Sequence, residues 1–579
     1  MRRSATVRPW ATDAVILCVV VVLSAALYFP RLGFYSDDWG FLGAFETAPD
    51  QSPGGLWHRQ YQWHTTTRHR PTQIALQVAL YWAFGLNPTP YHVANTIVLA
   101  LLAVLLLAVL RRLDLPRNVA FAIPAVYLLL PNYSTNRFWF ASFGYAVSMA
   151  FWALSLLGDL KALEATAQSM ILWKLVAIAS LVVSALGYEV VVPLLFVNVL
   201  VVWLRGRQLF EGGLPTRFGS AGAFLLLGTN LLALALVLLF KVWAVSRDPV
   251  LSANTLEPTL FHTAWVAYGA AKVNLGTYGL ALPYAFMWSV RKVGTWTLLA
   301  AVVAGALVAG SIMASSNWSK TRHDGSGARG LALRLALVGL LVLSLGYAPF
   351  LATSQITFTS TGNGNRANMA GALGMAILLV ALALRVSGLF ARRHTRNRVF
   401  SVAVAALCMV GFLVNNALAE FWVRAWEREQ SLTSSLQANV PDLPRRAHVL
   451  IDGVCPYAGP AVVLETWWDT SGLLQAIYGD ETVQGDVTSG EVRIGRRGVM
   501  TTVYDNRFHR YEPRLLLFDT HRNTARPLTD SRTAIRAIGT KYSSDEQRCP
   551  EAIPGEGVSV LPFDHATLPF VARIAEFLR

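Results

Sequence analysis

Charged residues are scarce in this sequence. Only 14% of its 579 residues are Asp, Glu, Lys or Arg, whereas 54% are hydrophobic. A soluble protein of this size exposes a far more charged surface, so the composition excludes an ordinary soluble globular fold. Apolar runs such as YHVANTIVLALLAVLLLAVL, which begins at Tyr91, approach the ~20 residues that a helix needs to cross a bilayer. The sequence therefore predicts an α-helical polytopic membrane protein.

We expect no cleavable signal peptide at the start of this sequence. Arg2, Arg3 and Arg8 precede the apolar run over residues 14–29, and no small-residue cleavage site follows it. We therefore expect this first apolar segment to remain in the protein as a signal anchor.

Acidic residues are fewer than basic ones: 34 Asp and Glu against 49 Lys and Arg give a net charge of +15. The basic residues fall in short clusters between apolar runs, which is typical of cytoplasmic loops and argues against a nucleic-acid partner. We expect about eleven spans, a cytoplasmic N-terminus and an extracytoplasmic C-terminus. The expected spans cover residues 13–30, 91–110, 118–131, 138–158, 170–187, 189–204, 221–243, 293–313, 331–352, 367–386 and 399–419.

The composition changes to charged residues near residue 420, which divides the chain into a transmembrane module over 1–420 and a tail over 421–579. Strand-like runs over 448–454 and 514–518 are separated by turn-rich loops. A tail of this length can bury its own core, so we predict a small extracytoplasmic α/β domain. The amphipathic stretch over 72–84 is too short to span easily and is expected on the membrane interface.

Cysteine is rare, and no CxxC motif or clustered histidine accompanies it. Cys18 and Cys408 lie inside predicted spans and are expected to be inert apolar fillers. Cys455 and Cys549 both lie in the exported tail, where an oxidising compartment favours a disulfide between them over a metal site.

An adjacent acidic pair, Asp37 and Asp38, follows the first span. Carboxylates at a membrane boundary are expensive to keep unless they have a use. One interpretation is helix capping by Ser36 or Asp37, with the acids in a favourable first turn. Neighbouring residues on a helix are about 100° apart, so the two acids face different ways. One could then face a cavity while the other caps the helix or holds a divalent metal ion, for which Asp38 is the candidate.

Cationic and polar residues lie on the same predicted side. The loop from Trp57 to Pro71 is rich in aromatic and basic residues, and its Arg70 could grip a phosphate. Interfacial anchoring by aromatics and snorkelling arginines is the structural alternative. His92 and Asn95 share a helix face, where they could line a cavity or bond a neighbouring helix. Three further charges sit at outer span ends: Arg137, Glu189 and Arg366.

Several short motifs follow one another in order. The acid pair, Arg70-Pro71 and the run at Tyr91 come first, and YLLLPNYSTNRFWFASF, GYEVVVPLLF and GNRANMA come after them. Together they resemble the GT-C superfamily of polytopic glycosyltransferases, especially bacterial relatives of protein O-mannosyltransferases. The resemblance covers roughly residues 13–420, and the tail carries no matching motif.

The resemblance implies an inverting transfer of a sugar from a polyprenyl-phosphate donor to a hydroxyl of a glycan, lipid or exported protein, outside a bacterial plasma membrane. An acid of the first external loop acts as general base in such enzymes, which corresponds to Asp37, with Asp38 as the alternative. The usual Asp-Glu pair is Asp-Asp here, and the ER-like segment reads Asn365-Arg366. The expected phosphate-binding residues are Arg70, Arg137, Arg366 and Lys272, and the expected cavity-lining residues are His69, His92, Asn95 and Glu189.

Two other functions fit the sequence. A transporter or flippase of lipid-linked saccharides would also carry intramembrane charges, although these would lie near the bilayer midplane. A family member without activity could use its tail to assemble a partner complex. The clustering of charges at one face favours the enzyme.

Overall fold

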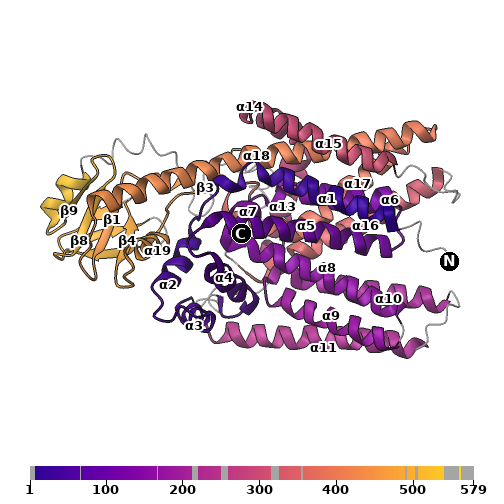
Figure 1. Cartoon of the computed structure of the whole chain (residues 1–579), viewed down its shortest axis with the longest axis horizontal. Coiled ribbons are helices and arrows are strands. Elements are labelled where there is room, and N and C mark those ends of the chain that lie inside the picture. The colour runs from indigo at the N-terminus through magenta and orange to yellow at the C-terminus, as the bar shows by residue number, and fades with distance from the viewer. Residues whose placement is uncertain are drawn as a thin grey trace.

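The computed structural model describes residues 7–64, 67–165, 167–211, 219–248, 259–314, 325–353, 357–488, 492–502, 506–539 and 560–561. Within these ranges, ten helices are long and apolar enough to cross a membrane. They lie side by side as one bundle, with an α/β domain beyond one end (Figure 1). The spanning helices are α1 (Val7–Ala26), α5 (Pro88–Arg112), α8 (Phe143–Glu164), α9 (Ala167–Ala185), α10 (Leu195–Glu211), α11 (Gly219–Ser246), α15 (Thr295–Ala314), α16 (Gly325–Tyr347), α17 (Met369–Ser387) and α18 (Arg393–Asn439).

One expected span is a short core helix. The segment predicted over 118–131 forms α6 (Arg117–Leu129), 13 residues long. At 1.5 Å per residue it covers about 20 Å, less than the ~30 Å of a bilayer core. All its residues from Asn118 onward are buried, because α1, α5, α15, α17 and α18 pack around it. Ten crossings would leave the start of α1 and the domain at the same end of the bundle, whereas they lie at opposite ends (Figure 1). The chain therefore makes an eleventh passage here, through α6 and the turns that follow it.

Three short helices cover the bundle on the side of the α/β domain, which we call the domain end. They are α2 (Asp37–Glu46), α3 (Pro53–Trp63) and α4 (Pro71–Phe84), and the last coincides with the predicted interfacial stretch. Proline opens both α3 and α4, where a missing N–H is tolerated. Ser52 also caps α3, accepting a hydrogen bond from the backbone N–H of Gly55 at 3.1 Å.

Helix α18 joins the bundle to the tail. It runs unbroken for 47 residues, so the predicted module boundary at 420 falls inside a helix. Its length is about 70 Å, more than twice what a bilayer core requires. The second half therefore projects beyond the bundle and packs against β2 (Tyr457–Ala458) and β3 (Ala461–Val462) of the domain.

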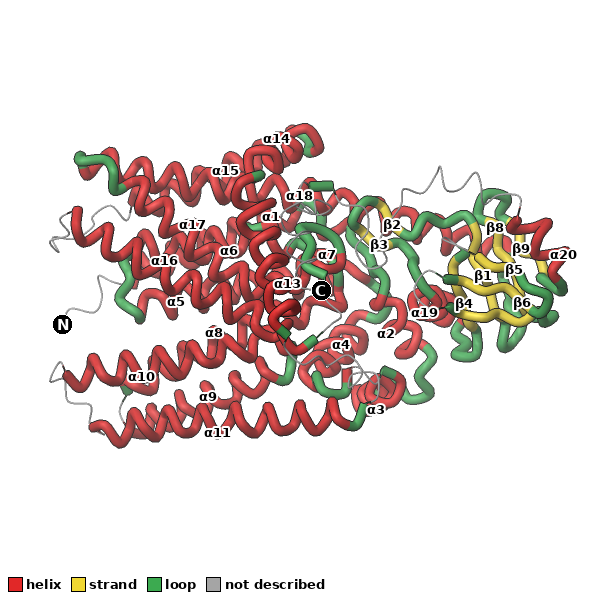
Figure 2. Tube along the Cα trace, turned by 180° about the vertical axis from the view of Figure 1, so that it is seen from behind, coloured by secondary structure: helices red, strands yellow, loops and turns green. Residues whose placement is uncertain are grey.

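The tail forms the α/β domain that the sequence predicts. Its main sheet has the strand order β4-β1-β8-β9, with β4, β1 and β8 parallel and β9 antiparallel. A second sheet has the order β5-β6-β7, and the strands lie together at the far tip of the molecule (Figure 2). The elements are β1 (His448–Asp452), α19 (Trp467–Tyr478), β4 (Gln484–Val487), β5 (Val492–Ile494), β6 (Gly498–Thr501), β7 (Arg507–Arg510), β8 (Leu515–Asp519), β9 (Thr524–Pro527) and α20 (Ser531–Ala534).

Glycines bring α2 of the first module against α19 of the domain. A Cβ on Gly43 would lie 2.4 Å from the carbonyl oxygen of Gly472, and a Cβ on Gly472 would lie 2.2 Å from that of Trp39. Only hydrogen side chains allow the two backbones to approach so closely. The acid pair opens α2, so this contact places it at the junction of the two modules.

Candidate functional site

The acid pair lies just after a strained turn. The backbone N–H of Asp38 donates to the carbonyl of Tyr35 at 3.0 Å, closing a tight turn with Ser36 at φ 49° and ψ −122°. These angles are those of the first central residue of a type II′ turn, a position that glycine normally occupies. A strained non-glycine residue persists only where its surroundings fix it. Here the Ser36 hydroxyl donates to Glu465 Oε1 of the domain at 3.2 Å.

Asp38 fixes this turn to the bundle. Its side chain is fully buried, and burial raises the pKa of its carboxyl well above the usual value despite backbone N–H donors. Oδ2 accepts from the N–H of Tyr35 at 2.9 Å, and Oδ1 accepts from the N–H of Ala141 at 2.7 Å. Both oxygens are thus used by the protein backbone, which gives Asp38 a structural role.

Asp37 is placed differently. Its side chain is half-buried, and Oδ1 accepts a hydrogen bond from the indole Nε1 of Trp468 at 2.9 Å. Among the described residues, Oδ2 accepts none. One oxygen of Asp37 is therefore held in place while the other remains open to a further partner.

Aromatic rings enclose the backbone around the pair. Tyr35 packs edge-on against Trp422 with ring centroids 4.8 Å apart, and its hydroxyl donates to the carbonyl of Trp422 at 2.9 Å. Trp139 Nε1 donates to the Tyr35 carbonyl at 2.8 Å. Trp39 stacks on Trp426. Such rigid, buried rings give the loop little freedom to move.

A second cluster is centred on Glu189, which we call the Glu189 cluster. Glu189 begins the 3₁₀-helix η5 (Glu189–Leu194), and Arg70 Nη2 lies 2.9 Å from its Oε2. Lys241 Nζ lies 2.7 Å from Oε1, and His69 Nε2 lies 3.2 Å from the same oxygen. The guanidinium of Arg70 also covers the ring of Tyr188, with its carbon 4.4 Å from the centroid.

The Glu189 cluster carries an excess of positive charge. Burial lowers the pKa of His69, even though Glu189 opposes this, so the imidazole is neutral near pH 7. Burial disfavours the charge on Arg70, but neighbouring Glu189 holds its pKa above the usual value. Two cations, Arg70 and Lys241, therefore share one carboxylate, which leaves one unbalanced positive charge.

The charges of both Asp37 and Arg70 reach the imidazole of His64. Burial lowers the pKa of its half-buried imidazole, and the charges of Asp37 and Arg70 act on it in opposite directions. Both groups are thus near neighbours of one ring. His64 is therefore within electrostatic reach of both Asp37 and Arg70.

Arg366 approaches the same region from another element. It belongs to the 3₁₀-helix η8 (Asn363–Asn368), and its guanidinium carbon lies 4.5 Å above the ring of Trp139. Burial raises the pKa of Tyr188, and both Arg70 and Arg366 counteract this rise. The structure therefore brings together His69, Arg70, Glu189 and Arg366, all of which the sequence singles out. The charge of Asp37 acts on His64, as does that of Arg70.

Three of the predicted site residues point into the helix bundle. The guanidinium of Arg137 donates to Ser24 Oγ at 3.2 Å and to the Tyr28 hydroxyl at 3.3 Å, both near the end of α1. His92 Nε2 pairs with the carbonyl of Gly33 at 3.0 Å. Asn95 Nδ2 donates to the carbonyl of Asn136 at 2.9 Å. These side chains brace loops behind the site, and we do not include them in it.

The predicted phosphate-binding Lys272 lies in an element outside both clusters, although Thr277 and Tyr278 of the same element hydrogen-bond Ser360, close to Arg366. It begins the π-helix η6 (Lys272–Leu280), which packs against α13 (Leu260–Ala271), α14 (Leu282–Lys292) and the 3₁₀-helix η3 (Pro131–Tyr133). The segments that carry the acid pair and the Glu189 cluster are not among these neighbours.

The described residues contain no complete set of side-chain ligands for a metal ion. Within the described ranges, no group of three or more His, Cys, Asp and Glu side chains could hold one. Asp38, the predicted candidate, already uses both carboxylate oxygens on backbone N–H groups. We therefore derive no chemical step that passes through a metal.

The cysteines follow the expected division in part. Cys18 and Cys408 are free, as predicted for apolar fillers. Cys455 is disulfide-bonded. Cys549 lies outside the described residues, so the predicted pairing of these two residues stays a prediction.

Three important residues escape sequence reasoning. Lys241 lies in a hydrophobic span, where a lone intramembrane lysine is itself a signal of function that the prediction overlooked. Trp468 lies more than four hundred residues after Asp37, and no sequence pattern joins them. His64 belongs to the aromatic and basic loop, but its closeness to both Asp37 and Arg70 is a property of the fold.

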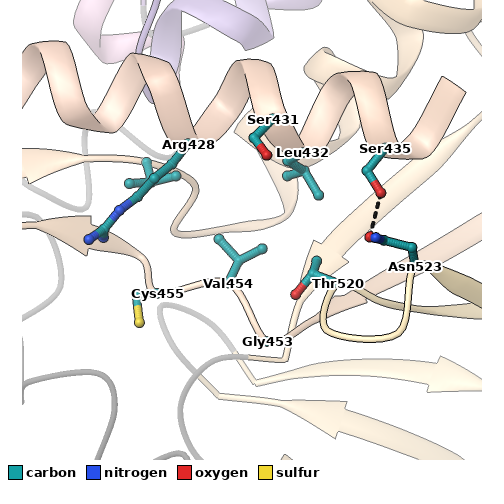
Figure 3. A pocket seen from close by; sticks show the side chains of 10 residues that line it. Arg428, Ser431, Leu432, Ser435, Gly453, Val454, Cys455, Thr520 and Asn523 are labelled. Atoms are coloured by element: carbon teal, nitrogen blue, oxygen red, sulfur yellow. Dashed lines mark hydrogen bonds between the residues drawn. The ribbon is translucent and has the colours of Figure 1, made fainter. Parts of the chain in front are cut away.

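A separate cavity of about 260 Å³ lies between α18 and the ends of β1 and β8 (Figure 3). Arg428 is the ionisable group that borders it, and its Nη1 donates to the carbonyl of Tyr457 at 3.3 Å. Ser435 hydrogen-bonds Asn523 across one side. Neither the acid pair nor the Glu189 cluster lines this cavity.

The fold and the two clusters define a multi-pass membrane protein with polar side chains gathered at one end of its bundle. No protein-family model matches the chain, and no curated protein does. Among solved structures, it is similar to ArnT from Cupriavidus metallidurans bound to undecaprenyl phosphate, with 15% identity, a TM-score of 0.35, and coverage of 76% of this chain and 82% of that chain. The apo form of the same protein is 14% identical, with a TM-score of 0.36 and coverage of 75% of this chain and 81% of that chain. At these TM-scores the likeness carries no argument about the activity of this chain.

Proposed function

We propose that the protein is a membrane glycosyltransferase of the GT-C type, which transfers a sugar with inversion from a polyprenyl-phosphate donor to an acceptor hydroxyl. One observation carries the proposal. A half-buried carboxylate with one unoccupied oxygen, Asp37, lies beside a cluster with excess positive charge at one end of a membrane bundle. The order of motifs from the acid pair to Arg366 supports the same assignment.

Asp37 supplies the base that the reaction needs. A sugar or protein hydroxyl is a weak nucleophile until a carboxylate accepts its proton during attack, a contribution of about 10²–10⁴ in rate. The acceptor oxygen forms a bond to the anomeric carbon while the bond from that carbon to the phosphate oxygen breaks. The proton passes to Oδ2 of Asp37, and the lipid phosphate leaves with the electron pair.

The cations stabilise the leaving group. Lipid phosphate departs as an anion and needs positive charge rather than a proton donor. Arg70 and Lys241 provide it, because Glu189 neutralises only one of the two. Glu189 also fixes both side chains before the donor arrives, which lowers the entropy lost on binding. Arg366 adds a third cation near Tyr188 and over the ring of Trp139.

The surroundings suit a lipid-linked substrate. Helix α4 follows Arg70 directly and exposes Trp82 and Phe84, whose side chains are 62% and 42% exposed. Large exposed aromatics are typical of the membrane–water interface. A donor whose lipid tail lies in the bilayer would present its phosphate at that level, beside Arg70.

A transporter of lipid-linked saccharides is the alternative. It would move the donor across the bilayer without breaking the bond between sugar and phosphate. Its polar groups would be expected near the middle of the bundle. The gathering of Asp37, Arg70 and Arg366 at the domain end favours transfer.

The experiment uses purified full-length protein in proteoliposomes that contain a panel of polyprenyl-phosphate sugars and hydroxyl acceptors. Transfer predicts glycosylated acceptor and free polyprenyl phosphate in equal amounts, lost in Asp37→Asn and kept in Asp50→Asn, an exposed acid of the same region. Movement of intact donor between leaflets without cleavage would instead establish the transporter.

A further inference from the structure

The C-terminal domain contacts the acid pair directly. Three hydrogen bonds cross from α2 and its turn to the end of α18 and the α/β domain. Trp468 Nε1 donates to Asp37 Oδ1 at 2.9 Å, Ser36 donates to Glu465, and Trp39 Nε1 donates to Glu429 Oε2 at 2.8 Å. The tail thus provides partners for the candidate base and for two residues close to it in the sequence, Ser36 and Trp39.

Trp468 is itself held in a fixed position. It lies in the first turn of α19, whose N-terminus is closed by a capping box between Thr466 and Asp469. Asp469 Oδ1 accepts from the N–H of Thr466 at 3.0 Å, and Oδ2 accepts from the N–H of Glu465 at 2.8 Å. Reciprocal caps of this kind leave the first turn little freedom.

The close approach of α2 and α19 fixes the distance between Trp468 and Asp37. Gly43 and Gly472 allow the backbones to touch, so α19 cannot slide along α2 without a clash. An ion pair of Arg59 with Glu481 at 2.7 Å adds a second link between the modules. The indole N–H is therefore positioned on Asp37 by two independent contacts.

We propose that Trp468 is a positioning residue for Asp37, holding Oδ1 so that Oδ2 faces the acceptor hydroxyl, and that the C-terminal domain is thereby part of the active site. This inference rests on the proposed function, since it assigns Asp37 the role of base. A hydrogen bond to one oxygen fixes the rotation of the carboxylate and favours its ionised form. Outer partners of reacting groups typically contribute 10–100-fold to activity.

The test compares Trp468→Phe, which keeps most of the ring but lacks the N–H, with wild type in the transfer assay. We expect kcat to fall about 10–100-fold with little change in the KM for donor. We also expect the acidic limb of the pH profile of kcat/KM to move to higher pH, because the carboxylate loses a donor that favours its charged form. A merely structural tryptophan would not move this limb.

The neighbouring Trp467 offers a matched control. It is also half-buried, its Nε1 has no hydrogen-bond partner among the described residues, and Arg507 packs on its ring at 3.4 Å. Trp467→Phe should therefore leave the pH profile of wild type unchanged. If Trp468→Phe does not fold, 3-benzothienylalanine at position 468 keeps the ring shape and replaces only the N–H by sulfur.

The outcomes separate the two proposals. Transfer by wild type, loss in Asp37→Asn and a shifted acidic limb at position 468 support the inference. Transfer by wild type with a wild-type limb in both position-468 variants overturns it, even if kcat falls. Transfer that persists in Asp37→Asn overturns the proposed function itself, whatever Trp468 does.

Discussion

At the scale of single residues, the two acids of the pair have different surroundings and different roles. Asp38 is buried and binds two backbone N–H groups, whereas Asp37 has one open oxygen. Their separation by about 100° around α2 follows from helix geometry. The sequence predicts that one acid serves the structure and the other a cavity. Which of them does so depends on Ala141 and Trp468, which the fold brings from distant segments.

Lys241 gives the first prediction at this scale. In Lys241→Met the donor loses one charged partner, and hydrogen bonds to charged groups contribute about 1.5–3 kcal/mol. We therefore expect the KM for donor to rise about ten- to a hundredfold. In this variant Glu189 retains its ion pair with Arg70 and its contact with His69, so the unfolding temperature should change little. Steady-state kinetics at varied donor concentration measure this effect.

Lys292→Met is the matched control for that measurement. Lys292 is exposed in the last turn of α14, which does not adjoin the Glu189 cluster. A KM in Lys241→Met equal to that of the control would remove Lys241 from the donor site.

At the scale of elements, the contact between α2 and α19 depends on two glycines. In Gly472→Ala the new Cβ would lie 2.2 Å from the carbonyl oxygen of Trp39, so the helices must separate. Overpacking of this kind destabilises by about 1–3 kcal/mol. We expect a lower unfolding temperature together with reduced transfer, because the bond between Trp468 and Asp37 lengthens. Calorimetry and the transfer assay check both.

Gly228 in α11 serves as the reference position, since nothing lies within 4 Å of a Cβ built there. Gly228→Ala should behave like wild type in both measurements. Equal behaviour of Gly472→Ala and Gly228→Ala would show that close packing between α2 and α19 is not required.

Much of the fold at this scale is predictable, since apolar run length decides which helices span. Ten described helices match expected spans, strand β1 falls within its predicted run, and strand β8 overlaps its predicted run to within one residue. One error has a clear cause: hydropathy reports composition and not the continuity of a helix. It ends α18 where the charges begin, although the helix continues.

The site is less predictable because it depends on contacts between distant segments. Glu189 and Arg366 were found through their charge at span ends and Arg70 through its aromatic and basic loop, and the structure places all three near Tyr188. Arg137 also carries a charge at a span end, but its side chain turns toward the end of α1. Side-chain direction, which distinguishes these cases, is set by packing that one sequence does not display.

At the scale of the whole molecule, the distribution of basic loops predicts the orientation. The loops that hold Arg111 and Arg112, or Arg392 and Arg393, lie at the end opposite the domain. The positive-inside rule puts that end in the cytoplasm and the domain end outside. Both the acid pair and the Glu189 cluster would then face the external side.

Cysteine labelling in intact spheroplasts measures this orientation. A membrane-impermeant maleimide should label Arg526→Cys, on the exposed strand β9, without permeabilisation. Leu389→Cys, in the exposed loop before α18, should react only after permeabilisation. The reverse pattern would place the site in the cytoplasm and contradict an external reaction.

The central claim is that Asp37 removes a proton from the acceptor, and azide tests it most directly. Azide is already an anion and needs no base, so it can attack the anomeric carbon without Asp37. In Asp37→Asn we expect transfer to hydroxyl acceptors to fall about 10²–10⁴-fold, while azide yields the inverted glycosyl azide at a rate close to that of wild type. Loss of both reactions, or retention of hydroxyl transfer, would contradict the role of Asp37 as the base.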